Sequence, residues 1–252
     1  MSLASKVPSI TGLFWLAKIL TTGLGETTSD FFVKSFDPVL AVLASGMVLL
    51  VVLAAQLLST GYLPWLYWAA VVMVSIFGTM AADVLHIQFG VSYAVSTVGF
   101  AIVLTVIFFV WYRLEHSLSI HTIRTRRQEL FYWATVLTTF ALGTAAGDLT
   151  ANTLQLGYFA SGIFFALVIA LPAAGFWRFG MNATLAFWFA YIVTRPLGAS
   201  FADWFAVSAE RGGLALGTGP ISLVLLAAIT TCVAFLARTR TSDIEPTPEP
   251  AR

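Results

Sequence analysis

The chain has 252 residues, of which 59% are hydrophobic and only 10% are charged, and its mean hydropathy is +0.89. A soluble domain carries roughly 25% charged residues, so this composition excludes an ordinary soluble protein and indicates an integral membrane protein. The single cysteine, Cys232, excludes an intrachain disulfide and a cysteine-based metal site.

Eight apolar segments are each long enough to cross a bilayer as a helix, because a hydrocarbon core of about 30 Å requires roughly 20 residues. They are too long and too continuously apolar for the alternating strands of a barrel. The fold class is therefore an all-α integral membrane protein with eight transmembrane helices, surrounded by the lipid bilayer. In chain order, we expect the helices at residues 9–32, 39–59, 65–85, 92–112, 129–150, 157–177, 182–205 and 219–237.

Lysine and arginine gather in alternate loops. The loop 113–128 contains four arginines, and Lys6 and Arg238 fall on the same side of the membrane, whereas Lys34 and Arg211 fall on the other side. The positive-inside rule then places both termini in the cytoplasm. We expect a multi-pass protein of the bacterial inner membrane, in which the basic loop is a topology signal. We expect no nucleic-acid partner.

One motif occurs four times at fixed spacing. It consists of an aromatic residue and a tryptophan, a glycine ten residues after the tryptophan and an aspartate fifteen residues after it, or [FY]-W-x9-G-x4-D. Four matches in these columns are hard to obtain by chance, since the whole chain has only 12 acidic residues. The columns are Trp15, Trp68, Trp133 and Trp188; Gly25, Gly78, Gly143 and Gly198; Asp30, Asp83, Asp148 and Asp203.

Each motif begins a unit of two helices. Two helices return the chain to the side of the membrane where it started, so all four motifs have the same polarity. This predicts parallel repeats about an axis along the membrane normal, each repeat a helix hairpin. We expect one membrane domain, residues 1–252, with a disordered cytoplasmic tail at 239–252 and with repeats at 9–60, 61–113, 128–178 and 181–238.

Three stretches, "KVPSITGLFWLAKILTTGLGETTSD", "YWATVLTTFALGTAAGDLTA" and "FWFAYIVTRPLGASFADW", carry a resemblance to a known family. The chain resembles a bacterial family of uncharacterised membrane-anchored proteins built from a four-fold two-helix repeat of unknown function. The resemblance covers nearly the whole membrane part. It implies a fold and a topology, and no settled activity.

Helix geometry places the four aspartates. We expect the tryptophans at the cytoplasmic interface, as in an aromatic belt, and fifteen helical residues travel about 22 Å toward the outer side. Lipid exposure of a charge costs up to roughly 2.5–3.5 kcal/mol, so the aspartates should face the bundle interior or water. The negative end of an unbroken helix is also unfavourable for them, by about 0.3–1 kcal/mol. Either the helices break at the motif glycines and the aspartates cap new pieces, or a bound cation compensates, or the columns serve packing and capping alone.

Three further charged residues lie within the spans: Lys18, Glu26 and Arg195. Together with the four aspartates their formal charges sum to −3. Buried charges must pair, bind a cation or take up a proton. We expect pairing across helices, for example of Lys18 with an acid of the first or fourth repeat, because eight residues separate Lys18 from Glu26 on one helix.

This acid-rich set predicts a membrane transporter of a small cation, with a divalent metal and proton coupling as hypotheses. Hard cations such as Mg²⁺, Ca²⁺ and Mn²⁺ take oxygen ligands. We expect no covalent cofactor, and the partner would be a small cation or a proton. Lys18 and Arg195 would compensate charge or compete for the site as tethered cations. The candidate ion-binding residues are Glu26, Asp30, Asp83, Asp148 and Asp203, with the four aspartates as candidate metal ligands.

Three alternatives remain at the level of sequence. The same residues could form an ion or proton channel. The charges could all be internal ion pairs of a structural membrane protein. An intramembrane enzyme is the third alternative, but the chain shows no Ser-His pair, no H-E-x-x-H and no phosphate loop. We therefore do not expect an enzyme.

Overall fold

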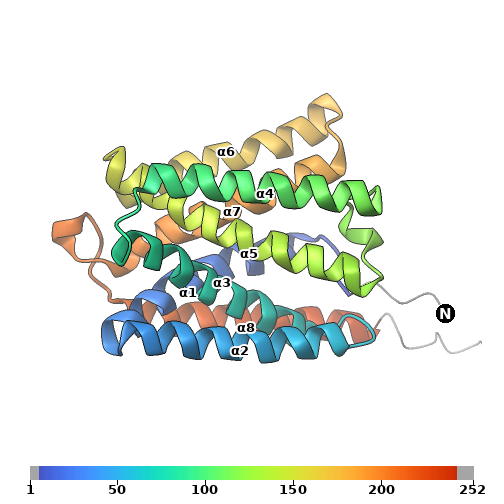
Figure 1. Cartoon of the computed structure of the whole chain (residues 1–252), viewed down its shortest axis with the longest axis horizontal. Coiled ribbons are helices and arrows are strands. Elements are labelled where there is room, and N and C mark those ends of the chain that lie inside the picture. The colour runs from blue at the N-terminus through green and yellow to red at the C-terminus, as the bar shows by residue number, and fades with distance from the viewer. Residues whose placement is uncertain (1–5, 243–252) are drawn as a thin grey trace, which may run out of the picture.

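The computed structural model describes residues 6–242 and their order of elements. Figure 1 shows long helices lying side by side along the long axis of the molecule. In the described part of the chain there is no strand. The long helices are α1 (Gly12–Ser35), α2 (Pro38–Leu58), α3 (Pro64–Ile87), α4 (Tyr93–Glu115), α5 (Arg126–Asp148), α6 (Gly157–Phe179), α7 (Ala183–Ala206) and α8 (Thr218–Ser242).

Short elements occupy three of the connections: η1 (Ile120–Thr122), the π-helical turn η2 (Leu149–Thr153) and η3 (Ala209–Arg211). The predicted spans agree with the long helices to within a few residues, except at the C-terminus. There α8 continues to Ser242, so the first residues of the expected tail are helical. The rest of the predicted tail lies outside the described residues.

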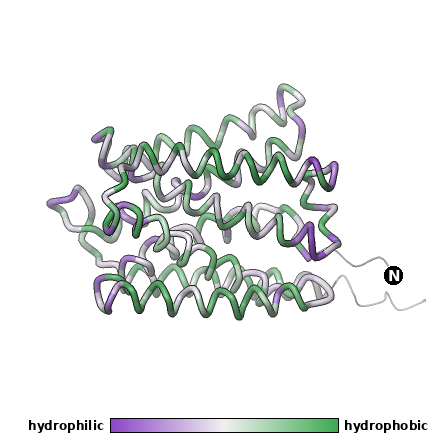
Figure 2. Tube along the Cα trace, in the orientation of Figure 1, coloured by the Kyte–Doolittle hydropathy of each residue, from purple (hydrophilic) through white to green (hydrophobic). Residues whose placement is uncertain are grey.

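Seven of the long helices, α2 to α8, are long and apolar enough to cross a membrane, and α2 is the most apolar with a hydropathy of 2.6. The chain is therefore a multi-pass membrane protein. Figure 2 shows the outer helices as largely hydrophobic, with hydrophilic residues toward the ends of the bundle. Helix α1 is less apolar because it contains Lys18, Glu26 and Asp30.

The four odd-numbered helices form a closed ring: α1 packs on α3, α3 on α5, α5 on α7, and α7 on α1. Each even-numbered helix packs mainly on the odd helix of the following repeat, α2 on α3, α4 on α5, α6 on α7 and α8 on α1. The expected helix hairpin is thus wrong as a packing unit, since the two helices of one repeat share few contacts. Every repeat buries its ring helix against its neighbours, α7 closes the ring on α1, and α8 packs on α1 from outside the ring.

The aromatic residues of the motif link each repeat to the next in the same cyclic order. In every case the residue before the tryptophan contacts the tryptophan of the following repeat, and such aromatic pairs contribute about 0.5–1.5 kcal/mol beyond the area they bury. The ring centroids are 5.8 Å apart for Phe14 and Trp68, 5.6 Å for Tyr67 and Trp133, 6.1 Å for Tyr132 and Trp188, and 5.6 Å for Phe187 and Trp15.

These contacts correct the expected position of the tryptophan column. Trp68, Trp133 and Trp188 are buried and Trp15 is half-buried. An aromatic belt would face lipid, whereas these side chains form an aromatic layer inside the bundle. The reason is that each indole fills the space between two ring helices of neighbouring repeats.

The motif glycines are the points of closest approach between ring helices. A Cβ added to any of the four would lie within 2.9 Å of an atom of the next repeat, so only glycine fits without a shift. Each partner is the seventh residue after its own tryptophan, which makes the contact cyclic and the four repeats parallel about the ring axis. The pairs are Gly25 with Ser75, Gly78 with Phe140, Gly143 with Arg195, and Gly198 with Thr22.

All four ring helices continue through their motif glycines. Helix α7 also continues through Pro196, and α5 ends only at Asp148, where η2 begins. The proposed break at the glycine is therefore wrong, and the aspartates do not cap the start of a second helical piece.

Candidate ion site on the ring axis

The centre of the ring is marked by Arg195, a fully buried residue of α7. One of its guanidinium nitrogens, Nη2, donates to Glu26 Oε2 at 2.7 Å, to Thr144 Oγ1 at 2.7 Å and to Thr79 Oγ1. The other, Nη1, donates to the carbonyl oxygen of Thr22 at 3.2 Å. These partners belong to α1, α3 and α5, so a single side chain binds all three other ring helices. Only a position on the axis allows this.

The ion pair between Arg195 and Glu26 is buried on both sides, with side-chain exposures of 0% and 8%. It confirms the expectation that charges in the bundle pair across helices. The other expected pairing is wrong, because Lys18 forms no ion pair with any acid of the described residues. Its ammonium nitrogen lies 4.2 Å from the ring centroids of Phe140 and Tyr191, and within the described residues it has no hydrogen-bond partner. Cation–π attraction takes the place of an ion pair.

Toward the tryptophan end, the axis continues as an aromatic hydroxyl pair. The Tyr67 and Tyr132 hydroxyl oxygens are 2.5 Å apart, and both side chains are buried. Most threonine hydroxyls of the ring helices bond carbonyl oxygens of their own helix, as Thr21 does to Lys18. They therefore contribute little to a polar path, while Ser75 donates across to the Thr21 carbonyl of α1.

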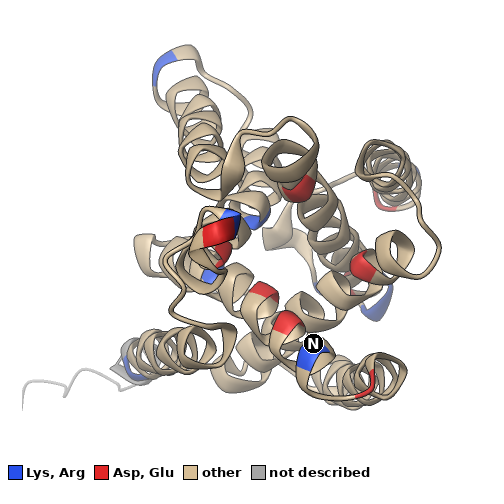
Figure 3. Ribbon diagram, turned by 90° about the vertical axis from the view of Figure 1, so that its left-hand side faces the viewer, with Lys and Arg blue, Asp and Glu red and all other residues tan. Residues whose placement is uncertain are grey.

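The opposite end of the axis carries the acidic residues. Glu26, Asp148 and Asp203 line one narrow pocket together with Tyr158 and Ser200, and in this conformation the pocket has no room for a water molecule. The structure therefore brings together three of the five predicted ion-binding residues. Figure 3 looks at this end of the bundle and shows acidic residues on helices around its middle.

The other two predicted acids lie apart from this pocket. Asp30 forms an ion pair with Lys34, one turn further along α1, and the lysine side chain is 55% exposed. Asp83 is half-buried on α3 and does not line the pocket, although it interacts electrostatically with Glu26 and Asp148.

The shared metal site of the four aspartates has no support in the described geometry. Within residues 6–242, no three His, Cys, Asp or Glu side chains are placed so that they could hold a metal ion. Asp30 already has a lysine partner, and Asp83 does not line the pocket that Asp148 and Asp203 share. The aspartates as metal ligands thus stay a prediction.

Arg211, in the α7–α8 loop, also reaches this end of the axis. The sequence did not predict that it lies near the acids. Arg211 donates to the Tyr158 hydroxyl at 2.5 Å, and Tyr158 lines the acidic pocket. The loop is held against the end of α7 by backbone bonds such as those from Leu214 to Trp204 and from Ala215 to Val207. Arg211 lies outside the repeated motif, so the motif columns could not predict this contact.

A second buried ion pair lies away from the ring axis. Lys6 Nζ donates to Glu129 Oε2 at 2.7 Å and to the Leu57 carbonyl at 3.0 Å, while Gln56 donates to Glu129 Oε1 at 3.1 Å. All three polar side chains are buried. They connect the segment before α1 with the end of α2 and the start of α5. Lys6 was expected only to mark the cytoplasmic side, and this structural contact was not expected.

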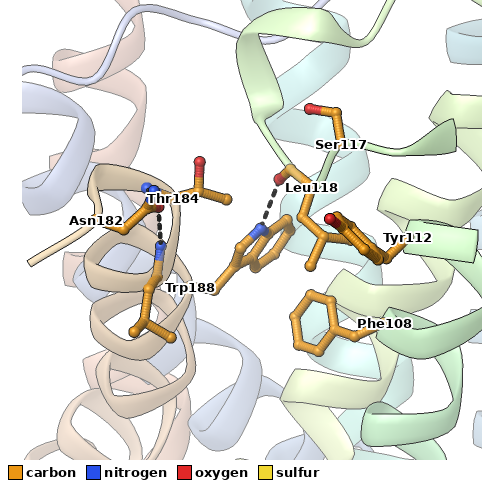
Figure 4. Close-up of a pocket in the computed structure, with 8 residues that line it drawn as sticks. Phe108, Tyr112, Ser117, Leu118, Asn182, Thr184 and Trp188 are labelled. Carbon is orange, nitrogen blue, oxygen red and sulfur yellow. Dashed lines mark hydrogen bonds between the residues drawn. The ribbon is translucent and has the colours of Figure 1, made fainter.

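A separate pocket lies beside Trp188, between the end of α4 and the start of α7 (Figure 4). The Trp188 indole nitrogen donates to the Leu118 carbonyl at 2.9 Å, and Asn182 caps α7 by accepting from the Leu185 amide. Its lining contains no charged side chain. This pocket therefore has no share in the charged column.

The four two-helix units match the family described as Repeat of Unknown Function (DUF347), over residues 13–62, 66–117, 131–181 and 186–242. The chain belongs to this family. The resemblance seen in the motif stretches is thereby confirmed. No curated protein and no solved structure matches the chain.

In this DUF347 protein, the ring accounts for the aromatic, tryptophan and glycine columns of the motif. They make the contacts through which one repeat closes on the next. Asp30 and Asp148 bond residues four positions further along the chain, Lys34 and Asn152, and within the described residues the aspartate column makes no such contact between repeats. It lies four residues beyond the position of Glu26, on the same face of the ring helices.

A further column of the DUF347 repeats lies one residue after the motif glycine. Eleven residues after each tryptophan come Glu26, Thr79, Thr144 and Ala199. The first three bind Arg195 and the fourth, on the helix of Arg195 itself, is small. The column was visible, but its convergence on one guanidinium depends on the closure of the ring.

Proposed function

We propose that the protein transports a small cation across the membrane, with the ring axis as the path. The pocket formed by Glu26, Asp148 and Asp203 is the observation that carries this proposal. A recess lined by charges of one sign concentrates counter-ions, and its low-dielectric walls strengthen the effect. Beneath the pocket, Arg195 and Lys18 fill the axis with positive charge.

The path is closed in this conformation, because Arg195 bridges all the ring helices. A closed axis favours a carrier that alternates between states over a permanently open channel. Proton coupling belongs to the proposal because the acids of the axis outnumber its cations. When the transported ion leaves, uptake of a proton would compensate the unpaired carboxylate. Saturable counter-transport would support the carrier, and single-channel currents would support the channel alternative.

The direct experiment is ion flux into proteoliposomes for Asp148→Asn and Asp203→Asn, with Na⁺, Rb⁺, Mg²⁺ and Mn²⁺ tested in turn. Each substitution removes a charge of the pocket with little change in shape, so we expect at least a tenfold loss of flux. Asp37→Asn is the matched control. Asp37 is exposed and caps α2 through the Leu40 amide, and asparagine caps equally well. Full flux in both pocket variants would contradict the proposal.

The alternative of a purely structural protein is supported by the buried ion pair of Arg195 and Glu26. If the protein serves only as a structural element, the wild type should show no flux of any of these ions. The four-fold Asp→Asn variant would then lose its fold. Retained folding with lost flux supports transport.

The orientation in the membrane is part of the same proposal. Helix α1 would be the eighth span, shielded from lipid by α3, α7 and α8, which pack against it. Both termini would lie in the cytoplasm of a bacterium, with the protein in the inner membrane, because arginines concentrate in the loop 113–128. A C-terminal fluorescent fusion should be bright and a C-terminal alkaline phosphatase fusion inactive; the opposite result would reverse the orientation.

A further inference from the structure

We infer that the oxygen atoms around Arg195 form a binding site for a small monovalent inorganic cation, and that the Arg195 guanidinium occupies this site as a tethered competitor. The inference rests on the proposed cation transport and names the inner site and the ion class. It concerns the oxygen cage formed by Glu26, Thr22, Thr79 and Thr144.

The cage has the geometry of an ion site. Three oxygens converge on the single nitrogen Nη2 of Arg195: Glu26 Oε2 and Thr144 Oγ1 at 2.7 Å, and Thr79 Oγ1 still closer. The Thr22 carbonyl oxygen lies 3.2 Å from the neighbouring nitrogen. Carboxylate, hydroxyl and carbonyl oxygens are the ligands of hard cations. All are buried, so the cage is held by the ring and not by mobile surface groups.

The charge of the cage selects the ion class. Glu26 is its only formal charge, and the hydroxyl and carbonyl oxygens are neutral, so one positive charge balances it. A divalent ion would leave a net positive charge buried in the ring, at a large desolvation cost. Lys18 adds to this cost, because its ammonium and the Arg195 guanidinium approach the same Phe140 ring, at 4.2 and 5.5 Å.

Arg195 has another acceptor to bind when a cation takes its place. Asp148, at the end of the neighbouring helix α5, lines the pocket that Glu26 also lines. Gly143 has no side chain, so nothing on α5 obstructs the Cβ and Cγ atoms of Arg195 that lie against it. Exchange of one cation for the guanidinium at Glu26 therefore conserves charge. It also frees the arginine to neutralise an acid of the pocket.

The test is equilibrium binding of ²²Na⁺ and ⁸⁶Rb⁺ to the purified full chain in detergent. Arg195→Ala removes the competitor, so we expect at least tenfold tighter binding of Na⁺ or Rb⁺ than in the wild type. The double variant Arg195→Ala/Glu26→Gln should return binding to the wild-type level. Mg²⁺ should not displace the bound ion at equal concentration. Binding no tighter in Arg195→Ala, binding retained in the double variant, or displacement by Mg²⁺ would each overturn the inference.

A second measurement covers the case in which Arg195→Ala does not fold, because Glu26 loses its buried partner. Arg195→Gln fills more of the space, and its unfolding temperature is compared in NaCl, RbCl and choline chloride. A bound ion stabilises only the folded state, so the unfolding temperature should rise with Na⁺ or Rb⁺. No difference from choline would overturn the site. Binding without flux of any ion would instead overturn only the proposed transport. Flux without ion binding in these variants would overturn only the inner site.

Discussion

Gly143 and Arg195 meet where α5 packs against α7, and this contact shows how one residue controls the centre of the molecule. A Cβ at position 143 would lie 2.2 Å from Arg195 Cγ and 2.5 Å from its Cβ. The arginine can therefore occupy the axis only because glycine faces it. In the other repeats, the motif glycines face Ser75, Phe140 and Thr22.

Gly143→Ala should lower the unfolding temperature, because overpacking costs about 1–3 kcal/mol and displaces Arg195 from Glu26. Gly147→Ala is the matched control, one turn further along α5. Its added Cβ would come no closer than 3.8 Å to Pro196, an ordinary contact. Alanine also favours a helix over glycine by roughly 0.5–1 kcal/mol. Thermal unfolding in detergent measures both, and equal stability of the two variants would contradict the role of Gly143.

Lys18→Met should change stability and transport in opposite directions. The Lys18 ammonium is buried without an anion or a hydrogen-bond partner in the described chain, so methionine removes a desolvated charge and should raise the unfolding temperature. If Lys18 maintains the charge balance of the path, flux should fall at the same time. Lys34→Met, in a more exposed pair with Asp30, should alter stability little. A drop in stability for Lys18→Met would show that its cation–π contacts outweigh the desolvation cost.

At the scale of helices, the repeat is stabilised by its neighbours. Each even helix lies mainly on the next odd helix, so a single two-helix unit has no core of its own. The pair of Lys6 and Glu129 adds a polar connection between the segment before α1 and the start of α5. Gln56 extends it to α2.

Glu129→Gln should destabilise the protein strongly, because removing one partner of a buried pair costs up to about 3–5 kcal/mol. Lys34→Gln is the comparison, since Lys34 pairs with Asp30 and its side chain is 55% exposed. Its loss should cost no more than about 1 kcal/mol. Unfolding temperatures in detergent distinguish the two, and an equal effect would mean that the Lys6 pair is not a stabilising connection.

For the whole molecule, closure of the ring between α1 and α7 is decisive, because it joins the first repeat to the last. Gly198 approaches the Ile19 carbonyl and Thr22, and Phe187 contacts Trp15. An open row of repeats would leave these contacts unmade. Arg195 would then reach neither Glu26 nor the Thr22 carbonyl.

Cysteines at Gly23 and Ala202 should form a disulfide on mild oxidation in a Cys232→Ser background. The Cβ atoms of the two positions would be 3.3 Å apart, near the range of about 3.5–4.5 Å found in disulfides. Cysteines at Gly99 and Ala202 are the control, because Gly99 has nothing within 4 Å of its added Cβ. Cross-linking is read from fragment sizes after cleavage in a connecting loop. Its absence in the first pair would argue against a closed ring.

The sequence by itself determined the helices, the four repeats and their common polarity. These depend on apolar length and on regular spacing, which are local properties of the chain. It also identified the charged residues of the spans, since charge is conspicuous in an apolar sequence. Glu26 and Arg195 stood out for this reason before their contact was known.

The tertiary structure alone decided which of these charges meet. Pairing depends on which helices become neighbours and on how each is rotated, and four parallel repeats could close into a ring or separate into two halves. The ring brings Arg195 to Glu26 and places Lys18 between aromatic faces. It turns the tryptophans inward and leaves the aspartates on different helices at one end, because the closest approaches in the ring lie at the motif glycines.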